Sequence, residues 1–196
     1  MSKTDQEKWD KRFADKPLNV PKVPGFVEAQ LTKLSTGRVL DVACGDGAAA
    51  LALAGIHGNQ VTALDVSSHA LARLEQFAVD AGVAINLRQM DVDCEASMQA
   101  LAEEAKYDLI VMCHFKPSSK LLKQLLAMLT AGGQLVLSTF NLRHHQQHGF
   151  SKRFCVDAEM YLPAPAGIDC LLYQSVERHG CFMDDYHFVN AMHSGG

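Results

Sequence analysis

A glycine-containing loop follows the first apolar run of the sequence. The stretch VLDVACGDGAAALALAG, Val39 to Gly55, passes from a β-like run through two closely spaced glycines into a helix-forming run. Such loops present backbone N–H groups to nucleotides. Gly45–Ala50 fits the dinucleotide pattern G-x-G-x-x-A, and no segment matches the phosphate-loop pattern G-x-x-x-x-G-K-[ST]. The glycines alone leave the identity of the ligand open.

Aspartates at the ends of predicted strands narrow this choice. Asp41 ends the first strand, Asp65 ends the second strand 24 residues later, and Asp91 follows the third strand. In an open α/β sheet these strand ends meet at one edge, where ligands bind. Asp46 lies at the start of the next helix, where its carboxylate would compete with a pyrophosphate. The acids favour a ligand with a ribose and a base but no pyrophosphate.

Strand and helix patterns alternate along most of the chain. Predicted strands cover Arg38–Asp41, Gln60–Asp65, Ala84–Met90, Tyr107–Cys113 and Gly133–Phe140; predicted helices cover Ala48–Gly55, Ser67–Ala81, Glu95–Ala105 and Ser118–Leu129. Ser67 and Ser68 are N-cap candidates, and Gly82 and Gly132 are helix stop signals. The strands are almost continuously apolar, which predicts an α/β fold with a doubly wound, mostly parallel sheet.

Two later strand-like runs, Ile168–Glu177 and Cys181–Ala191, predict an antiparallel hairpin that closes the sheet. We expect a single domain with three parts: residues 1–36 form an N-terminal helical cover, 37–140 the cofactor-binding core, and 141–196 a lid segment and the closing hairpin.

Composition excludes several classes of protein. The 196 residues are 48% apolar and 20% charged, which is ordinary for one globular domain, and the net charge of −4 argues against a nucleic-acid partner. No apolar run approaches the roughly 18 residues of a membrane span, and the first residues lack a signal-peptide pattern, so we expect a cytoplasmic protein. Six cysteines without a CxxC pair indicate neither a disulfide framework nor a metal site. A monomer or a homodimer is expected.

Taken in order, the segments VLDVACGDG, VTALDVS, MDVD, YDLIVMCHF and LTAGGQLVLSTF resemble the motif set of class I S-adenosylmethionine-dependent methyltransferases, from Arg38 to Phe140. More narrowly, the chain is similar to small bacterial tellurite-resistance-type methyltransferases through Trp9–Phe13, the Cys113–Lys116 segment and a Phe140, Gln146, Gly149 pattern. The resemblance implies a Rossmann-like fold, S-adenosylmethionine as cofactor, S-adenosylhomocysteine as product and a small-molecule acceptor.

The resemblance also implies the cofactor contacts. Asp65 would bind both ribose hydroxyls, and Asp41 would orient the amino end of the methionine part. Asp91 would receive the adenine amino group. Ala43 departs from the family, which usually has a glycine there. The implied cofactor-binding residues are Asp41, Ala43, Cys44, Gly45, Gly47, Asp65, Val66, Asp91, Val92 and Cys113.

The acceptor side offers several candidates. Methyl transfer from a sulfonium needs mainly alignment, and a base only where the acceptor must lose a proton. His114, His145 and His148 are candidate bases; the last two lie in Asn141–Phe154, interpreted as a cationic lid or as a solvated loop. Trp9, Arg12, Phe13 and Arg143 are substrate-side candidates, the first three by the family resemblance. The segment after the fourth strand reads CHFK, unlike the N-P-P-Y of DNA amino-methylating enzymes.

Two alternatives from other classes remain open. One is an NAD-dependent oxidoreductase that uses Gly45–Ala50 as its dinucleotide loop. The other is a non-catalytic cofactor-binding protein in which the acceptor pocket is filled.

Overall fold

The computed structural model describes residues 3–191 and is built on a seven-stranded sheet of order β3-β2-β1-β4-β5-β7-β6. The strands are β1 (Arg38–Val42), β2 (Gln60–Asp65), β3 (Ile85–Gln89), β4 (Tyr107–Cys113), β5 (Leu129–Phe140), β6 (Ile168–Arg178) and β7 (Cys181–Asn190). The first five are parallel; β7 pairs antiparallel with both β5 and β6. The predicted doubly wound sheet with a closing hairpin is confirmed.

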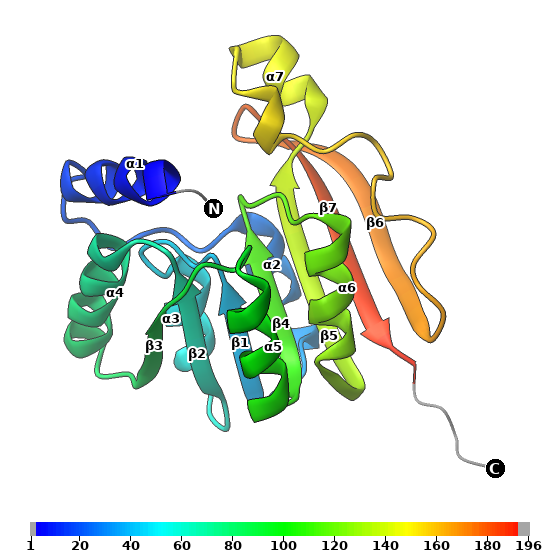
Figure 1. Ribbon diagram of the computed structural model, residues 1–196, viewed down its shortest axis with the longest axis horizontal. Helices are drawn as coiled ribbons and strands as arrows, with labels where there is room; N and C mark the ends of the chain where they lie inside the picture. Colours follow the sequence, from blue (N-terminus) through cyan, green and yellow to red (C-terminus); the bar gives the residue numbers. More distant parts are fainter. Residues whose placement is uncertain (1–2, 192–196) are drawn as a thin grey trace.

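Helices cover both faces of the sheet, and two more lie at its end (Figure 1). One apolar core lies under α2 (Gly25–Gln30), α3 (Ala48–Ala54) and α4 (Ser68–Ala81), and the other under α5 (Glu95–Glu104) and α6 (Ser119–Ala127). Helices α1 (Lys3–Ala14) and α7 (Leu142–His148) lie at the end of the sheet toward which β5 points. The short 3-10 turns η1 (Leu31–Lys33) and η2 (Lys152–Phe154) follow α2 and α7. Within residues 3–191, no helix is long and apolar enough to span a membrane.

Local sequence signals account for the bounds of α4. The Ser67 hydroxyl accepts a hydrogen bond from the Ala70 N–H at 3.1 Å and so caps the first turn. Leu74 lies on the buried face, and Gly82 ends the helix in the left-handed conformation at φ +66°. Both predicted signals are confirmed. They matter for the site because the cap Ser67 lies two residues after Asp65.

For the later part of the chain, one expectation was wrong and one of two open alternatives is excluded. Gly132 does not stop a helix: α6 ends at Ala127, and Gly132 lies within β5 at φ +73°, where the register with β4 shifts. The left-handed conformation of this glycine instead accommodates the irregular pairing of β5 with β4. The histidine-rich segment after β5 is not a plain loop, because Asn141 accepts a hydrogen bond from the Arg143 N–H and caps helix α7.

Gly47 fixes the packing of the loop after β1. It has φ +83°, and a Cβ atom there would lie 2.1 Å from Cδ1 of Leu74 on α4. The glycine is therefore needed both for the backbone conformation and for the close approach of α4 to the loop.

We expect Gly47→Ala to destabilise the fold by about 2 kcal/mol or more, because left-handed strain of roughly 1–2 kcal/mol adds to overpacking of similar size. Gly82→Ala is the matched control, since Gly82 has φ +66° but nothing within 4 Å of its Cβ position, and should show the strain alone. Urea unfolding of both variants measures the difference. Equal losses would contradict the packing role of Gly47.

Candidate functional site

A cavity of about 830 Å³ lies at the carboxyl ends of the parallel strands. It is next to β1, where the strand order reverses between β2 and β4, the usual ligand position in this architecture. The volume lies within the roughly 300–1,000 Å³ typical of small-molecule sites. Seven of the sequence-predicted cofactor residues line this cavity: Asp41, Ala43, Cys44, Gly45, Asp65, Val66 and Cys113.

Asp65 joins two loops at this edge. Its Oδ2 accepts a hydrogen bond from the Gly45 N–H and its Oδ1 accepts one from the Ser67 N–H, both at 2.8 Å. Burial raises the pKa of this carboxyl, and the backbone N–H groups oppose that rise. Each oxygen can accept a further hydrogen bond. Asp65 is therefore oriented to receive a pair of hydroxyl groups from a ligand in the cavity.

Asp41 is a second acid, and it is more deeply buried at 2% exposure. Its Oδ2 accepts a hydrogen bond from the Ala50 N–H at 2.9 Å. Burial, together with the nearby charge of Asp65, raises the pKa of Asp41 to about 7. A cationic ligand group beside this carboxyl would favour its ionised form.

Asp46, at the start of α3, is already neutralised by the protein. Its Oδ2 lies 2.6 Å from Nζ of Lys16 and 3.3 Å from both Nε and a terminal nitrogen of Arg73. The Arg73 guanidinium also donates to the backbone carbonyls of Lys16 and Pro17 at 2.8 Å. This ion-pair cluster, in which Asp46 and Arg73 are buried and Lys16 is exposed, occupies the start of α3 and fixes the chain that follows α1.

Helix α1 lies between α4 and η2. On one side the Ser67 hydroxyl donates to Oδ1 of Asp10 at 2.7 Å. On the other side the Trp9 ring meets the Phe154 ring edge-on, with centroids 6.4 Å apart. Trp9, Arg12 and Phe13, the predicted cover residues, all line the cavity. A Cβ at Gly45 would lie 3.1 Å from the Phe13 ring, so the glycine permits this close approach.

Of the predicted base candidates, the structure brings only His114 to the cavity. His145 donates through Nδ1 to the Phe150 carbonyl at 2.6 Å, and His148 donates through Nε2 to the Gly180 carbonyl at 2.8 Å. Arg143, also predicted for the substrate side, lies over the Phe182 ring at 4.5 Å. These three residues do not line the cavity; the contacts of His148 and Arg143 hold α7 on the tip of the β6–β7 hairpin, and that of His145 holds the segment after α7.

Three predicted cofactor residues also lie outside the cavity lining. Gly47 packs on Leu74, and Val92 is buried in the core beneath α5. Asp91 accepts a hydrogen bond from the Asp93 N–H at 2.9 Å within a turn, and Asp93 lines the cavity instead. Within residues 3–191, no group of three His, Cys, Asp or Glu side chains is arranged to hold a metal ion.

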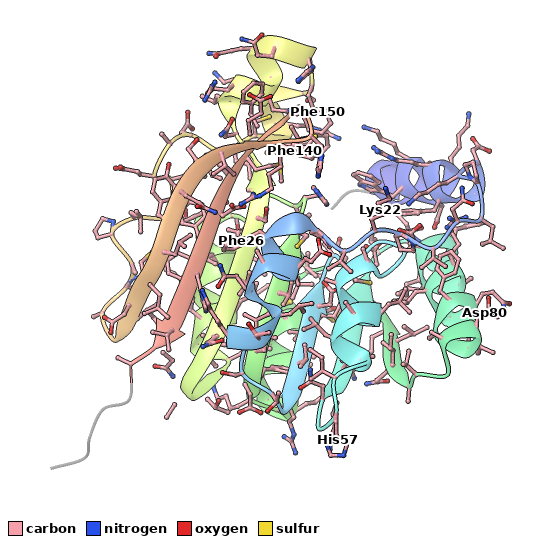
Figure 2. The ribbon with its side chains drawn as sticks, turned by 180° about the vertical axis from the view of Figure 1, so that it is seen from behind. Lys22, Phe26, His57, Asp80, Phe140 and Phe150 are labelled. Carbon is pink, nitrogen blue, oxygen red and sulfur yellow. The ribbon has the colours of Figure 1, made fainter. Side chains whose placement is uncertain are left out.

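Sequence reasoning predicted Trp9 and Phe13 for this site but did not predict four further aromatic side chains that line the cavity. Phe140 and Phe150 lie together below α7, with ring centroids 4.8 Å apart and at the opposite end of the molecule from His57 (Figure 2). Phe115 and Phe154 line the same cavity. For Phe115, just after β4, and Phe140, the last residue of β5, the available signal was their position at the carboxyl ends of strands; Phe150 and Phe154 lie beyond α7 and had no such signal.

The fold and the acids at the strand ends are those of an α/β protein that binds a nucleotide-like ligand at the carboxyl edge of its sheet. Residues 12–196 match the family model described as a methyltransferase domain, and the chain belongs to this family. It is 30% identical over 135 residues to a ubiquinone biosynthesis O-methyltransferase of Xanthomonas axonopodis pv. citri, a match that covers 68% of this chain and 56% of the relative. The chain thus spans little more than half the length of that curated relative.

Solved structures share the fold at lower sequence identity. TehB from Haemophilus influenzae superposes with a TM-score of 0.68 at 17% identity, covering 93% of this chain and 67% of TehB. The N-methyltransferase NodS from Bradyrhizobium japonicum gives a TM-score of 0.65 at 15% identity, covering 97% and 99% of the two chains. These likenesses confirm the methyltransferase-type fold that the sequence motifs predict.

We expect Arg73→Met to lower the free energy of unfolding by about 2 kcal/mol, since it removes charged hydrogen bonds to two backbone carbonyls and leaves Asp46 with Lys16 alone. Arg88→Met is the matched control, because Arg88 pairs with Glu104 at the exposed surface, where an ion pair contributes less than about 1 kcal/mol. Urea denaturation compares the two. Trypsin cleavage after Lys22 should quicken only in Arg73→Met, and an unchanged cleavage rate would remove the anchoring role.

Proposed function

We propose that this protein transfers a methyl group from S-adenosylmethionine to a small-molecule acceptor. The observation that carries the proposal is the Asp65 carboxylate, held between the Gly45 and Ser67 N–H groups with acceptor capacity toward the cavity. Membership of the methyltransferase family supports the same reaction. When bound, the cofactor supplies an activated methyl group on a sulfonium, so the protein has to align the acceptor with it.

The residues present fit such a cofactor. Asp65 offers one oxygen to each of two ribose hydroxyls, and Val66 gives an apolar wall beside it. Asp41 would attract the ammonium end of the methionine part, and Cys113 at the end of β4 would offer its backbone carbonyl to the cofactor. Burial raises the pKa of both the Cys44 and Cys113 thiols, so neither is a thiolate nucleophile.

The site does not favour the two rival functions. A dinucleotide would place its pyrophosphate at the start of α3, where the Asp46 carboxylate already has its cationic partners. A non-catalytic cofactor-binding protein would have its acceptor pocket filled, yet the cavity continues past His114 to Phe150 and Phe154. Family membership adds weight against the oxidoreductase.

Three further features belong to this proposal. The net charge of −4 supports a small acceptor rather than a nucleic acid, as does the relative named for ubiquinone biosynthesis. The six cysteines are all free, which supports a reducing compartment such as the cytoplasm. The proposed assembly is a monomer or a homodimer.

We expect Asp65→Asn to weaken S-adenosylhomocysteine binding at least 100-fold, because two hydrogen bonds from ribose lose their charged acceptor. Asp108→Asn is the matched control: Asp108 also accepts from a backbone N–H, that of Arg38, but at the other end of the sheet. Calorimetric titration gives both affinities. Equal affinity in Asp65→Asn and the unmodified protein, or stabilisation by NADH but not by S-adenosylhomocysteine, would contradict the proposal.

Cofactor affinity should depend on pH through Asp41. Its carboxyl, with a pKa of about 7 in the free protein, is protonated below that pH and must lose its proton before it can pair with the ligand ammonium. The dissociation constant of S-adenosylhomocysteine should therefore rise as pH falls below 7, approaching tenfold per pH unit. Above about pH 8 the ligand amine itself loses its charge. In Asp41→Asn this loss of affinity below pH 7 should be absent. If the loss persists in the variant, a group other than Asp41 causes it.

A further inference from the structure

The cavity is divided by charge and by surface type. Its carboxylates come from the ends of β1 and β2, Asp41 and Asp65, and from the loops after β1 and β3, Asp46 and Asp93. Beyond β4 the lining contains no carboxylate among the described residues, and it carries the cationic side chains of Lys116 and Arg153. Arg12 of α1 adds a third cation, over the Trp9 ring at 5.1 Å. This half therefore offers no negative charge to an acceptor with a protonated amine, but it offers positive charges to an anionic acceptor.

Aromatic rings form the walls of the same half. The half-buried rings that line it are Trp9, Phe115, Phe140, Phe150 and Phe154, whereas Phe13 lies against Gly45 in the loop after β1. They contact one another across chain segments: Phe150 lies 5.9 Å from Phe154, and Trp9 on α1 reaches Phe154 on η2. Aromatic walls of this kind favour flat rings, which bind by offset or edge-to-face stacking. A small inorganic or aliphatic acceptor would leave most of this surface without contact.

His114 is the basic group within this aromatic half. It directly follows β4 and holds a left-handed backbone at φ +58°, uncommon for a residue other than glycine. Its ring lies 5.4 Å from Phe140, and no hydrogen bond to the ring is formed within residues 3–191. Desolvation of the ring within the cavity, together with the charge of Arg12, lowers the pKa of His114, so the imidazole is neutral near pH 7. A neutral, unpaired imidazole that lines the cavity can accept a proton from an acceptor.

We infer that the acceptor is a planar aromatic compound with an ionisable hydroxyl group and an anionic substituent, and that His114 is the base that deprotonates the hydroxyl. The inference rests on the proposed function. The hydroxyl proton passes to an imidazole nitrogen of His114. The acceptor oxygen then forms the new O–CH₃ bond as the S–CH₃ bond breaks, and that electron pair stays on the sulfur. The imidazolium finally releases its proton to water.

Trp9 provides a binding signal independent of turnover, because it is the single tryptophan of the chain and lines the cavity. With S-adenosylhomocysteine bound, para-hydroxybenzoate and a dihydroxybenzoate should change Trp9 fluorescence. The saturated cyclohexane analogue of para-hydroxybenzoate should bind at least tenfold more weakly, as should tyramine, whose ammonium replaces the carboxylate. With S-adenosylmethionine, the aromatic acids should yield S-adenosylhomocysteine and an O-methyl product by mass spectrometry.

His114→Asn tests the base. Asparagine tolerates the left-handed backbone but does not accept a proton near neutral pH. We expect its turnover to fall about 100-fold, with acceptor affinity by Trp9 fluorescence within about twofold of the unmodified protein. At saturating S-adenosylmethionine, where the loss of cofactor affinity through Asp41 no longer limits the rate, the fall in turnover below the ordinary histidine pKa of about 6.5 should also disappear. His148→Asn, which removes an imidazole outside the cavity, should keep both turnover and this fall at low pH.

The two levels of proposal fail in different ways. If S-adenosylhomocysteine does not bind in calorimetry, the proposed function is wrong. If it binds, but the aromatic acids give neither a Trp9 signal nor a methylated product while tellurite, a thiol or an amine is methylated, only the acceptor assignment is overturned. An unchanged pH profile and turnover in His114→Asn would overturn its role as base.

Discussion

The carboxylate of Asp65 is the constraint on which the rest of the site depends. It is 7% exposed, and its oxygens hold the N–H of Gly45 in the loop after β1 and the N–H of Ser67 at the start of α4. Removing such a buried charged acceptor would leave two backbone donors unsatisfied, at roughly 1–3 kcal/mol each. One side chain thus sets the separation of two loops as well as the position of a ligand group.

The same interaction extends to the cover of the cavity. Ser67 uses its N–H for Asp65 and its hydroxyl for two tasks, accepting from the Ala70 N–H and donating to Asp10 of α1. Because Ser67 both caps α4 and binds α1, the start of α4, the Asp65 carboxylate and α1 are linked by consecutive hydrogen bonds. A displacement of α1 would therefore change the surroundings of Ser67, and a displacement of Asp65 would change those of α1.

Sequence pattern predicted the parts of the molecule that depend on local signals. The parallel strands and α4 follow from apolar runs and from the cap residues Ser67 and Gly82, which act within a few residues of their positions. The site was predicted as far as strand ends define it, through Asp41, Gly45 and Asp65. Strand-end position alone predicted Asp91 as the cavity residue after β3, but Asp93 lines the cavity. The turn between the two residues determines which carboxyl faces the cavity, and strand position does not reveal that turn.

The remainder depends on contacts between distant segments, which periodicity does not encode. His145 and His148 have the right chemistry for a base, but the Phe150 and Gly180 carbonyls hold their rings outside the cavity. Gly132 has the right residue type for a helix stop, yet the pairing of β5 with β4 places it inside a strand. The aromatic half of the cavity is formed by three segments that are distant in the sequence, α1, the end of β5 and η2. These segments meet only in the folded chain.

The two sides of α1 are held by different kinds of interaction, and this difference bears on how the cavity is used. Toward α4 the contacts are directional and charged, through Asp10 and through the Lys16, Asp46 and Arg73 cluster. Toward η2 they are aromatic, with Trp9 and Lys8 against the Phe154 ring. Separating these aromatic contacts leaves no hydrogen-bonding group unpaired, so a flat ring between α1 and η2 would replace them with equivalent offset or edge-to-face stacking. The charged side would keep α1 in place meanwhile, so the cofactor half need not be disturbed when the acceptor half exchanges its contents.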